Sequence, residues 1–127
     1  MDFPNLIATL RGHPESHKMG MIASHLGIVR GSSRDGREVS SIEVKYDRDR
    51  LRNIVEEMKG LPGIIDIQVE VREGHLQVGD EILAVAVGGD IRENVFDALI
   101  KTVNRIKAEA SSKRENFQGS GERHGND

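Results

Sequence analysis

The chain has 127 residues, a formal net charge of −3 and no cysteine, and only 3% of its residues are aromatic. This length predicts one domain with a real core, the acidic balance argues against nucleic-acid binding, and the lack of cysteine excludes disulfides and thiolate chemistry. No apolar run reaches the ~20 residues of a membrane span and no signal-peptide core is present, so we expect a cytoplasmic protein.

The first third of the sequence predicts strands. Residues 5–10 (NLIATL) favour a first strand. Residues 20–30 (GMIASHLGIVR) are apolar with several small residues, which is typical of a strand with a bulge or a close backbone contact. Residues 38–46 alternate between apolar and polar side chains, and we expect them to pair with the preceding strand as a hairpin across the polar loop at 31–37.

The middle of the chain predicts a helix and two more strands. Asp47 can cap a helix that runs to about Lys59 and stops at Gly60. Residues 64–72 alternate as a strand, and residues 80–87 (DEILAVAV) form the longest apolar and β-branched run. We expect Gly88-Gly89 to end that strand.

The last helix begins at a start signal and contains one anomaly. Asp90 followed by Glu93 predicts a capping box. Helical spacing predicts one buried arc made of Phe96, Leu99, Ile100, Val103 and Ile106. Lys101 falls on the polar side, whereas Lys107 falls inside the apolar arc. Lys107 is therefore either a lysine that extends to solvent, favoured by the helix dipole, or an ammonium held in a pocket.

The order of elements predicts a mixed α+β domain with mostly antiparallel strands and two main helices. We expect this domain to cover residues 1–110. Residues 111–127 are polar and glycine-bearing, which predicts a flexible tail. Its first part, 111–117, could order against a partner or ligand and carry an active-site segment.

Two groups of side chains could bind a ligand. His13, His17 and His25 permit a metal site, but surface histidines explain their pattern better. The second group is cationic, and each member alone is best explained as a solvated surface charge: Arg30 and Arg72 at strand ends, Arg92 in the first turn of the last helix, Lys107 on the apolar arc, and then Lys113. Arg92 is unusual because the dipole disfavours a cation in the first turn of a helix unless an anion joins it.

Taken in order, these pieces resemble the MoaE family, the catalytic (large) subunit of molybdopterin synthase. GMIASHLGIVR matches the family's strand ending in Gly-x-Val-Arg, and REGHLQVGDEI matches its Arg-x-Gly-x-Leu-x-x-Gly-(Asp/Glu) pattern. VAVGGDIRENVFDAL matches its Val-x-Val strand, arginine and Val-Phe helix, and the helix ends at Lys107 before a second lysine in KRE. The likeness covers roughly residues 5–116.

The chain also departs from the family pattern. Ile91-Arg92 and Val71-Arg72 replace two His-Arg pairs, and the Pro-x-Trp between the two lysines is absent. An aromatic residue common before Gly-x-Val-Arg is replaced by His25-Leu26. A catalytically weakened homologue that only binds a pterin, an anion or a carrier protein as a dimer is therefore the alternative.

The resemblance implies an α/β-hammerhead-like fold and a sulfurtransferase that needs no metal or cofactor. The expected substrate is cyclic pyranopterin monophosphate, and the expected partner is a small ubiquitin-like (MoaD-like) sulfur carrier whose C-terminal Gly-Gly thiocarboxylate supplies the sulfur. It further implies a homodimer within a heterotetramer, without nucleic acid or membrane. Lys107 and Lys113 match the catalytic lysines, and Arg30, Arg92 and Arg72 would bind substrate.

Overall fold

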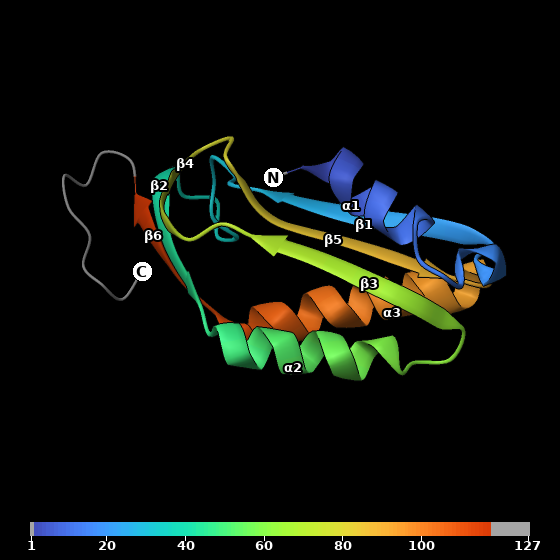
Figure 1. The fold of residues 1–127 in the computed structure, drawn as a ribbon. Helices are drawn as coiled ribbons and strands as arrows, with labels where there is room; N and C mark the ends of the chain where they lie inside the picture. The colour runs from blue at the N-terminus through green and yellow to red at the C-terminus, as the bar shows by residue number, and fades with distance from the viewer. Residues whose placement is uncertain (1, 118–127) are drawn as a thin grey trace.

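A computed structural model describes residues 2–117 of the chain, which form two three-stranded sheets and three α-helices. The long sheet has the strand order β1-β5-β3, with α1 on one face and α2 and α3 side by side on the other (Figure 1). The second sheet, β4-β2-β6, stands at one end of the first. In chain order the elements are α1 (Phe3–Arg11), η1 (Ser16–Lys18), β1 (Met21–Ile28), β2 (Val39–Tyr46), α2 (Arg48–Lys59), β3 (Ile64–Val71), β4 (Gly74–Gln77), β5 (Glu81–Gly89), α3 (Arg92–Arg105), η2 (Ile106–Ala110) and β6 (Ser111–Phe117).

The predicted first strand is wrong, because residues 5–10 lie in helix α1. The Asp2 carboxylate accepts a hydrogen bond of 3.1 Å from the Asn5 amide, and a proline stands in the first turn, so both ordinary helix-start signals are present. Leu6 and Leu10 lie one turn apart and are buried against β5. Helical spacing of these two leucines, rather than strand alternation, decides the local structure.

The predicted hairpin between residues 20–30 and 38–46 is also wrong. β1 pairs antiparallel with β5, whereas β2 pairs antiparallel with β4 and β6 in the second sheet. Only the loop between the two segments is closed, by an isolated bridge between Ser32 and Glu38 and a hydrogen bond from the Val39 amide to the Gly31 carbonyl. The alternation of apolar residues in 38–46 predicted a strand correctly, but it carries no information about which strand is its partner.

Gly88-Gly89 does not end the strand, because β5 continues through Gly89. These glycines serve close packing instead. A Cβ on Gly89 would lie 2.7 Å from the Gly63 carbonyl oxygen and 2.8 Å from a methyl group of Val95. Gly63 has a φ of +77°, a backbone conformation that favours glycine. The start of α3 can therefore approach the end of β5 closely.

The expected capping box at Asp90 and Glu93 is not formed. The Asp90 carboxylate accepts hydrogen bonds from the Ile91 amide (2.6 Å) and the Asn94 side-chain amide (2.9 Å), and the helix begins at Arg92 without a side-chain cap on its backbone amides. By contrast, α2 is as predicted, because the Asp47 carboxylate accepts from the Arg50 amide and Gly60 follows its end.

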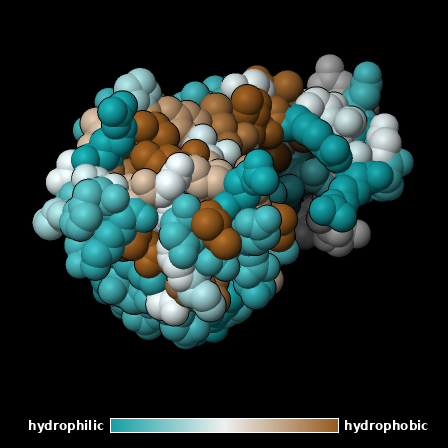
Figure 2. Space-filling model, turned by 90° about the vertical axis from the view of Figure 1, so that its right-hand side faces the viewer, coloured by the Kyte–Doolittle hydropathy of each residue, from teal (hydrophilic) through white to brown (hydrophobic). Residues whose placement is uncertain are grey.

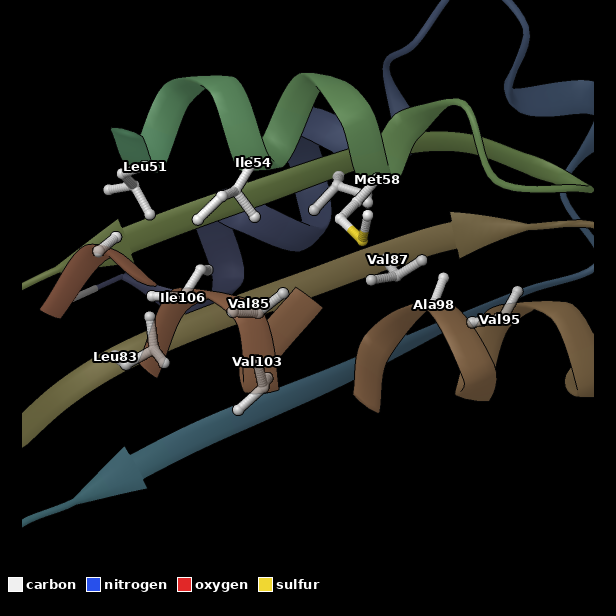
Figure 3. Packing of buried hydrophobic residues seen from close by; sticks show 12 residues of the cluster. Leu51, Ile54, Met58, Leu83, Val85, Val87, Val95, Ala98, Val103 and Ile106 are labelled. Atoms are coloured by element: carbon white, nitrogen blue, oxygen red, sulfur yellow. The ribbon is translucent and has the colours of Figure 1, made fainter. Parts of the chain in front are cut away.

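The buried face of α3 differs from the predicted arc. Phe96 and Ile100 are 47% and 60% exposed, while Val95, Ala98 and Thr102 are buried with Val103 and Ile106. Figure 3 shows the resulting core, in which Leu51, Ile54 and Met58 of α2 face side chains of β5 and α3. Lys107 is exposed rather than buried on the apolar arc, whereas Lys101 is exposed as predicted and pairs with Asp97 at 2.9 Å.

Residues 111–117 are a strand rather than the start of a flexible tail. β6 pairs antiparallel with β2 over almost its whole length, from Ser111 opposite Tyr46 to Phe117 opposite Val39. The remaining part of the predicted tail, 118–127, lies outside the described residues. β2 is therefore the central strand of the second sheet.

Apolar side chains also reach the surface. Figure 2 shows an apolar area across the upper half of one face, surrounded by polar side chains. The exposed large apolar residues of the described chain include Ile91, Phe96 and Ile100, at the start of α3 and on its outer side. No helix within residues 2–117 is both long and apolar enough to cross a membrane.

Candidate functional site

A pocket of about 500 Å³ lies where the two sheets meet. Its apolar lining comes from Val29 directly after β1, from Ile82 and Leu83 of β5, and from alternate residues of β2. The alternate residues are Ile42, Val44 and Tyr46, so the period-2 pattern of β2 directs one row of side chains into the pocket. This wall provides a dry surface beside the charged groups described next.

Four cations line this pocket together with a single carboxylate. Arg30, Lys107 and Lys113 were expected from the sequence to be functional, and Arg34 joins them. The carboxylate in the pocket belongs to Glu115. Within residues 2–117, none of these four cations forms an ion pair. Cations that remain unpaired around an apolar wall attract an anionic ligand.

Each cation is positioned by a different element. Arg30 follows β1, and its Nε donates a hydrogen bond of 3.1 Å to the Ser32 carbonyl oxygen. Lys107 lies on η2, a turn of π-helix at the end of α3, and its carbonyl accepts a hydrogen bond from the Ser111 hydroxyl at 3.0 Å. Lys113 lies on β6 opposite Val44. Turns of π-helix inside α-helices are rare and frequently occur at functional sites.

Tyr46 adds a neutral hydrogen-bonding group to the pocket. Burial raises the pKa of its hydroxyl to about 12, and the nearby Glu73 carboxylate acts in the same direction. The phenol is therefore protonated throughout the physiological range and can donate a hydrogen bond to a ligand. Among cations, a neutral donor of this kind helps to orient an anion without adding charge.

Two of the expected substrate-binding residues lie outside this pocket. Arg72 directly follows β3, with its backbone amide bonded to the Ile82 carbonyl at 3.0 Å, and its side chain is exposed. Arg92 is exposed in the first turn of α3. At 1.5 Å per residue, the stretch from Arg92 to Lys107 spans roughly 20 Å, so one chain cannot bring both side chains to the same ligand.

The three histidines considered for a metal site do not form one. In the part of the chain that the structure describes, no group of three or more histidine or carboxylate side chains is arranged to hold a metal ion. His13 Nδ1 instead accepts a hydrogen bond of 3.0 Å from the Glu15 amide. His25 lies on β1, partly buried.

Sequence reasoning missed two residues of the pocket. Tyr46 could have been found, because it continues the alternation of Ile42 and Val44. Arg34 lies in a polar loop without any periodic pattern, so no local signal places its side chain toward Lys107 and Lys113. Only the folded loop brings Arg34 to the pocket.

The MoaE family model, described as "MoaE protein", matches residues 2–109. The chain belongs to the MoaE family. It is 35% identical over 109 residues to the molybdopterin synthase catalytic subunit of Ralstonia nicotianae, covering 82% of this chain and 60% of that MoaE relative. This chain therefore spans less than two thirds of the length of the Ralstonia subunit.

Solved structures have the same MoaE fold. The molybdopterin biosynthesis MoaE protein of Burkholderia ambifaria is 26% identical, with a TM-score of 0.73 over 92% of this chain and 82% of that one. A complex of subunits 1 and 2 of molybdopterin-converting factor from Helicobacter pylori contains a chain with a TM-score of 0.69 at 14% identity, over 94% of this chain and 82% of that one, a likeness of fold alone. The predicted α+β class with antiparallel sheets is confirmed.

Proposed function

We propose that this MoaE protein is the catalytic subunit of a molybdopterin synthase, a sulfurtransferase of molybdenum cofactor biosynthesis. It would transfer sulfur from the C-terminal thiocarboxylate of a small carrier protein to cyclic pyranopterin monophosphate. The observation that carries the proposal is that Arg30, Lys107 and Lys113, which match the family's cations, line one pocket with Arg34. The proposed cellular location is the cytoplasm.

The pocket's groups suit this chemistry. Arg30 and Arg34 can hold the substrate phosphate by charge-assisted hydrogen bonds, each contributing about 1.5–3 kcal/mol. Sulfur transfer from an acyl group passes through anionic tetrahedral species, which the ammonium groups of Lys107 and Lys113 can stabilise. The apolar wall and the neutral Tyr46 hydroxyl suit the pterin rings beside these charges.

The proposed partner is a MoaD-like carrier ending in Gly-Gly. The Helicobacter pylori relative was solved as a complex of subunits 1 and 2, which supports a two-subunit enzyme. A narrow diglycine tail suits a pocket that already holds the bulkier pterin, because glycine has no side chain to exclude it. The carrier's thiocarboxylate adds a second anion for the four unpaired cations.

We also propose a homodimer, as part of a heterotetramer with two carriers. Exposed apolar side chains at the start of α3 and on its outer side, Ile91, Phe96 and Ile100, suit contact with a second copy. If Arg92 binds substrate, it does so in the pocket of that second copy, because it lies at the opposite end of α3 from its own Lys107. We also propose that Arg72, an exposed cation directly after β3, contributes to substrate binding.

The deciding experiment mixes the protein with thiocarboxylated carrier and cyclic pyranopterin monophosphate and measures molybdopterin. We expect the wild type to form product and Lys107→Ala to form none. The control is Lys101→Ala, which removes a lysine charge from α3 outside the pocket and should keep wild-type activity. Substrate or carrier binding without product in the wild type would instead support the alternative, a dimeric binding module. Failure to bind either would overturn both.

A further inference from the structure

His25 lies behind Gly27, a residue that lines the pocket, and has no role in the chemistry described so far. It lies on β1 two residues before Gly27, so the two residues share one face of the strand. A Cβ on Gly27 would lie 3.4 Å from His25 Nε2, and Gly27 lines the pocket. The imidazole therefore packs over the space that the glycine leaves open.

The Nε2 atom of His25 is buried and has no hydrogen-bond partner among the described residues. Buried polar atoms are nearly always paired in folded proteins, so an unpaired acceptor beside a pocket-lining residue can receive a hydrogen bond from a donor in the pocket. Lys107, conversely, has hydrogen-bond donors without acceptors in the described part of the chain. Its ammonium has three donors, and within residues 2–117 it forms neither a hydrogen bond nor an ion pair.

The two side chains border the same region, because His25 Nε2 lies against Gly27, and Gly27 and Lys107 line the same pocket. Burial lowers the pKa of His25, and the charge of Lys107 lowers that pKa further. The imidazole is therefore neutral at neutral pH, and the tautomer with its proton on Nδ1 has a lone pair on Nε2. Among the described residues, His25 Nε2 is thus an acceptor without a donor, and the Lys107 ammonium beside the same pocket is a donor without an acceptor.

The other groups around His25 are mostly uncharged. On β5 its partner is Val85, flanked by Ala84 and Ala86. From α3, Leu99 and Val103 belong to the core cluster that also contains Ala23 of β1. Glu81 and Arg30 lie toward the strand ends, and Lys107 of η2 is the charged side chain that acts on the ring.

We propose that His25 is a positioning residue whose Nε2 accepts a hydrogen bond from the Lys107 ammonium when ligand fills the pocket. Ligand displaces the water that solvates this exposed ammonium, and a desolvated ammonium needs replacement acceptors. His25 Nε2 supplies one from behind Gly27, which leaves the other N–H donors of Lys107 directed at the bound anion. The catalytic part of this inference rests on the proposed function. It assigns a use to a histidine at a position where the family pattern commonly has an aromatic residue.

The first test is independent of activity. The pH titration of the His25 ring is followed by NMR in the wild type, in Lys107→Ala and in the charge-matched control Lys101→Ala. We expect Lys107→Ala to raise the His25 midpoint, because a neighbouring positive charge is removed, and Lys101→Ala to leave it unchanged. An unchanged midpoint in Lys107→Ala would overturn the proposal.

The second test is the pH profile of molybdopterin formation in His25→Phe and His25→Gln. Phenylalanine keeps the ring shape without an acceptor, and glutamine keeps an acceptor that does not titrate. We expect His25→Phe to lower kcat about tenfold or more with little change in KM, as for loss of a hydrogen bond to a charged group. We expect the wild-type rate to decline at acid pH, where imidazolium cannot accept a hydrogen bond. We expect His25→Gln to retain most of the rate and to show no such decline.

The outcomes separate this inference from the proposed function. If His25→Phe is folded by its thermal unfolding curve and has the wild-type rate and pH profile, His25 only fills space and the inference is wrong. If the wild type forms no molybdopterin, the proposed function fails, while the NMR comparison still decides whether His25 and Lys107 interact.

Discussion

The guanidinium carbon of Arg37 lies 3.7 Å from the centroid of the Phe117 ring, which joins the loop after β1 to the end of β6. The same loop is closed by backbone hydrogen bonds from the Ser33 amide to the Arg37 carbonyl (2.8 Å) and from the Val39 amide to the Gly31 carbonyl (2.9 Å). This loop carries Arg34 to the pocket. The contact between Arg37 and Phe117 therefore helps to hold one of the four pocket cations.

Replacing Phe117 by alanine should loosen that loop. An exposed cation–π contact contributes about 0.5–1 kcal/mol, so we expect the Ser33 and Val39 amides to exchange hydrogen up to about fivefold faster. Hydrogen exchange measured by NMR checks this, with Phe96→Ala on α3 as the control. Equal exchange rates in Phe117→Ala and the wild type would show that the contact between Arg37 and Phe117 does not help to hold the loop.

Gly89→Ala should destabilise the fold, because a methyl group there would collide with the Gly63 carbonyl and Val95. We expect a loss of about 1–3 kcal/mol in the free energy of unfolding, typical of overpacking. The matched control is Gly12→Ala, where the φ is −87° and a Cβ would meet its nearest atom at 3.4 Å. Urea denaturation should show a change within about 0.5 kcal/mol for the control. A similar result for Gly89→Ala would contradict the close-packing explanation.

Glu109 should stabilise the protein in a pH-dependent way. Hydrogen bonds from Arg105, aided by Arg50, lower its pKa to about 2. Because the folded pKa lies below the unfolded value of about 4.3, the stabilisation is present above pH ~4.3 and disappears as the pH falls toward 2. We therefore expect Glu109→Gln to be less stable than the wild type at pH 7 and the difference to shrink below pH ~4.

Denaturation curves at several pH values measure this difference. Glu93→Gln is the control, because Glu93 forms no ion pair in the described part of the chain. A difference between Glu109→Gln and the wild type that stays constant down to pH 2 would contradict the assignment.

The geometry of α3 predicts complementation between inactive variants. Lys107→Ala and Arg92→Ala should each lack activity, because each removes a cation from every site of the proposed dimer. After the two are mixed and subunits exchange, half of the dimers are mixed, and each of these has one intact site, so about a quarter of wild-type activity should return. No recovery, with subunit exchange verified by native mass spectrometry, would mean that Arg92 does not serve the second copy's pocket.

The elements that were predicted correctly have signals within a few residues. α2 has a cap at Asp47 and a stop at Gly60, and β3 has regular alternation. The wrong prediction of strand pairing concerns contacts between residues that are distant in the sequence. Residues 38–46 had the alternation of a strand, but their partners β4 and β6 lie on other parts of the chain. α1 has local start signals, and its misassignment came from reading a short apolar run as a strand.

The candidate site was predictable in part. The resemblance to the MoaE family pointed to Arg30, Lys107 and Lys113, and all three line one pocket. Arg34 was not predictable, because a polar loop has no pattern that fixes the direction of its side chains. The burial of α3 was misjudged because apolar residues occupy more than one of its faces. The small Ala98 and the polar Thr102 face the core while Phe96 and Ile100 do not.

The turn of π-helix at Ile106–Ala110 has a consequence for how this enzyme family can vary. Lys107 lies on this turn and Lys113 on the strand that follows it, so a short stretch of backbone determines the separation of their two amino groups. Insertion or loss of one residue in this turn would change the distance between the two amino groups, while the sheets and the helix core stay as they are.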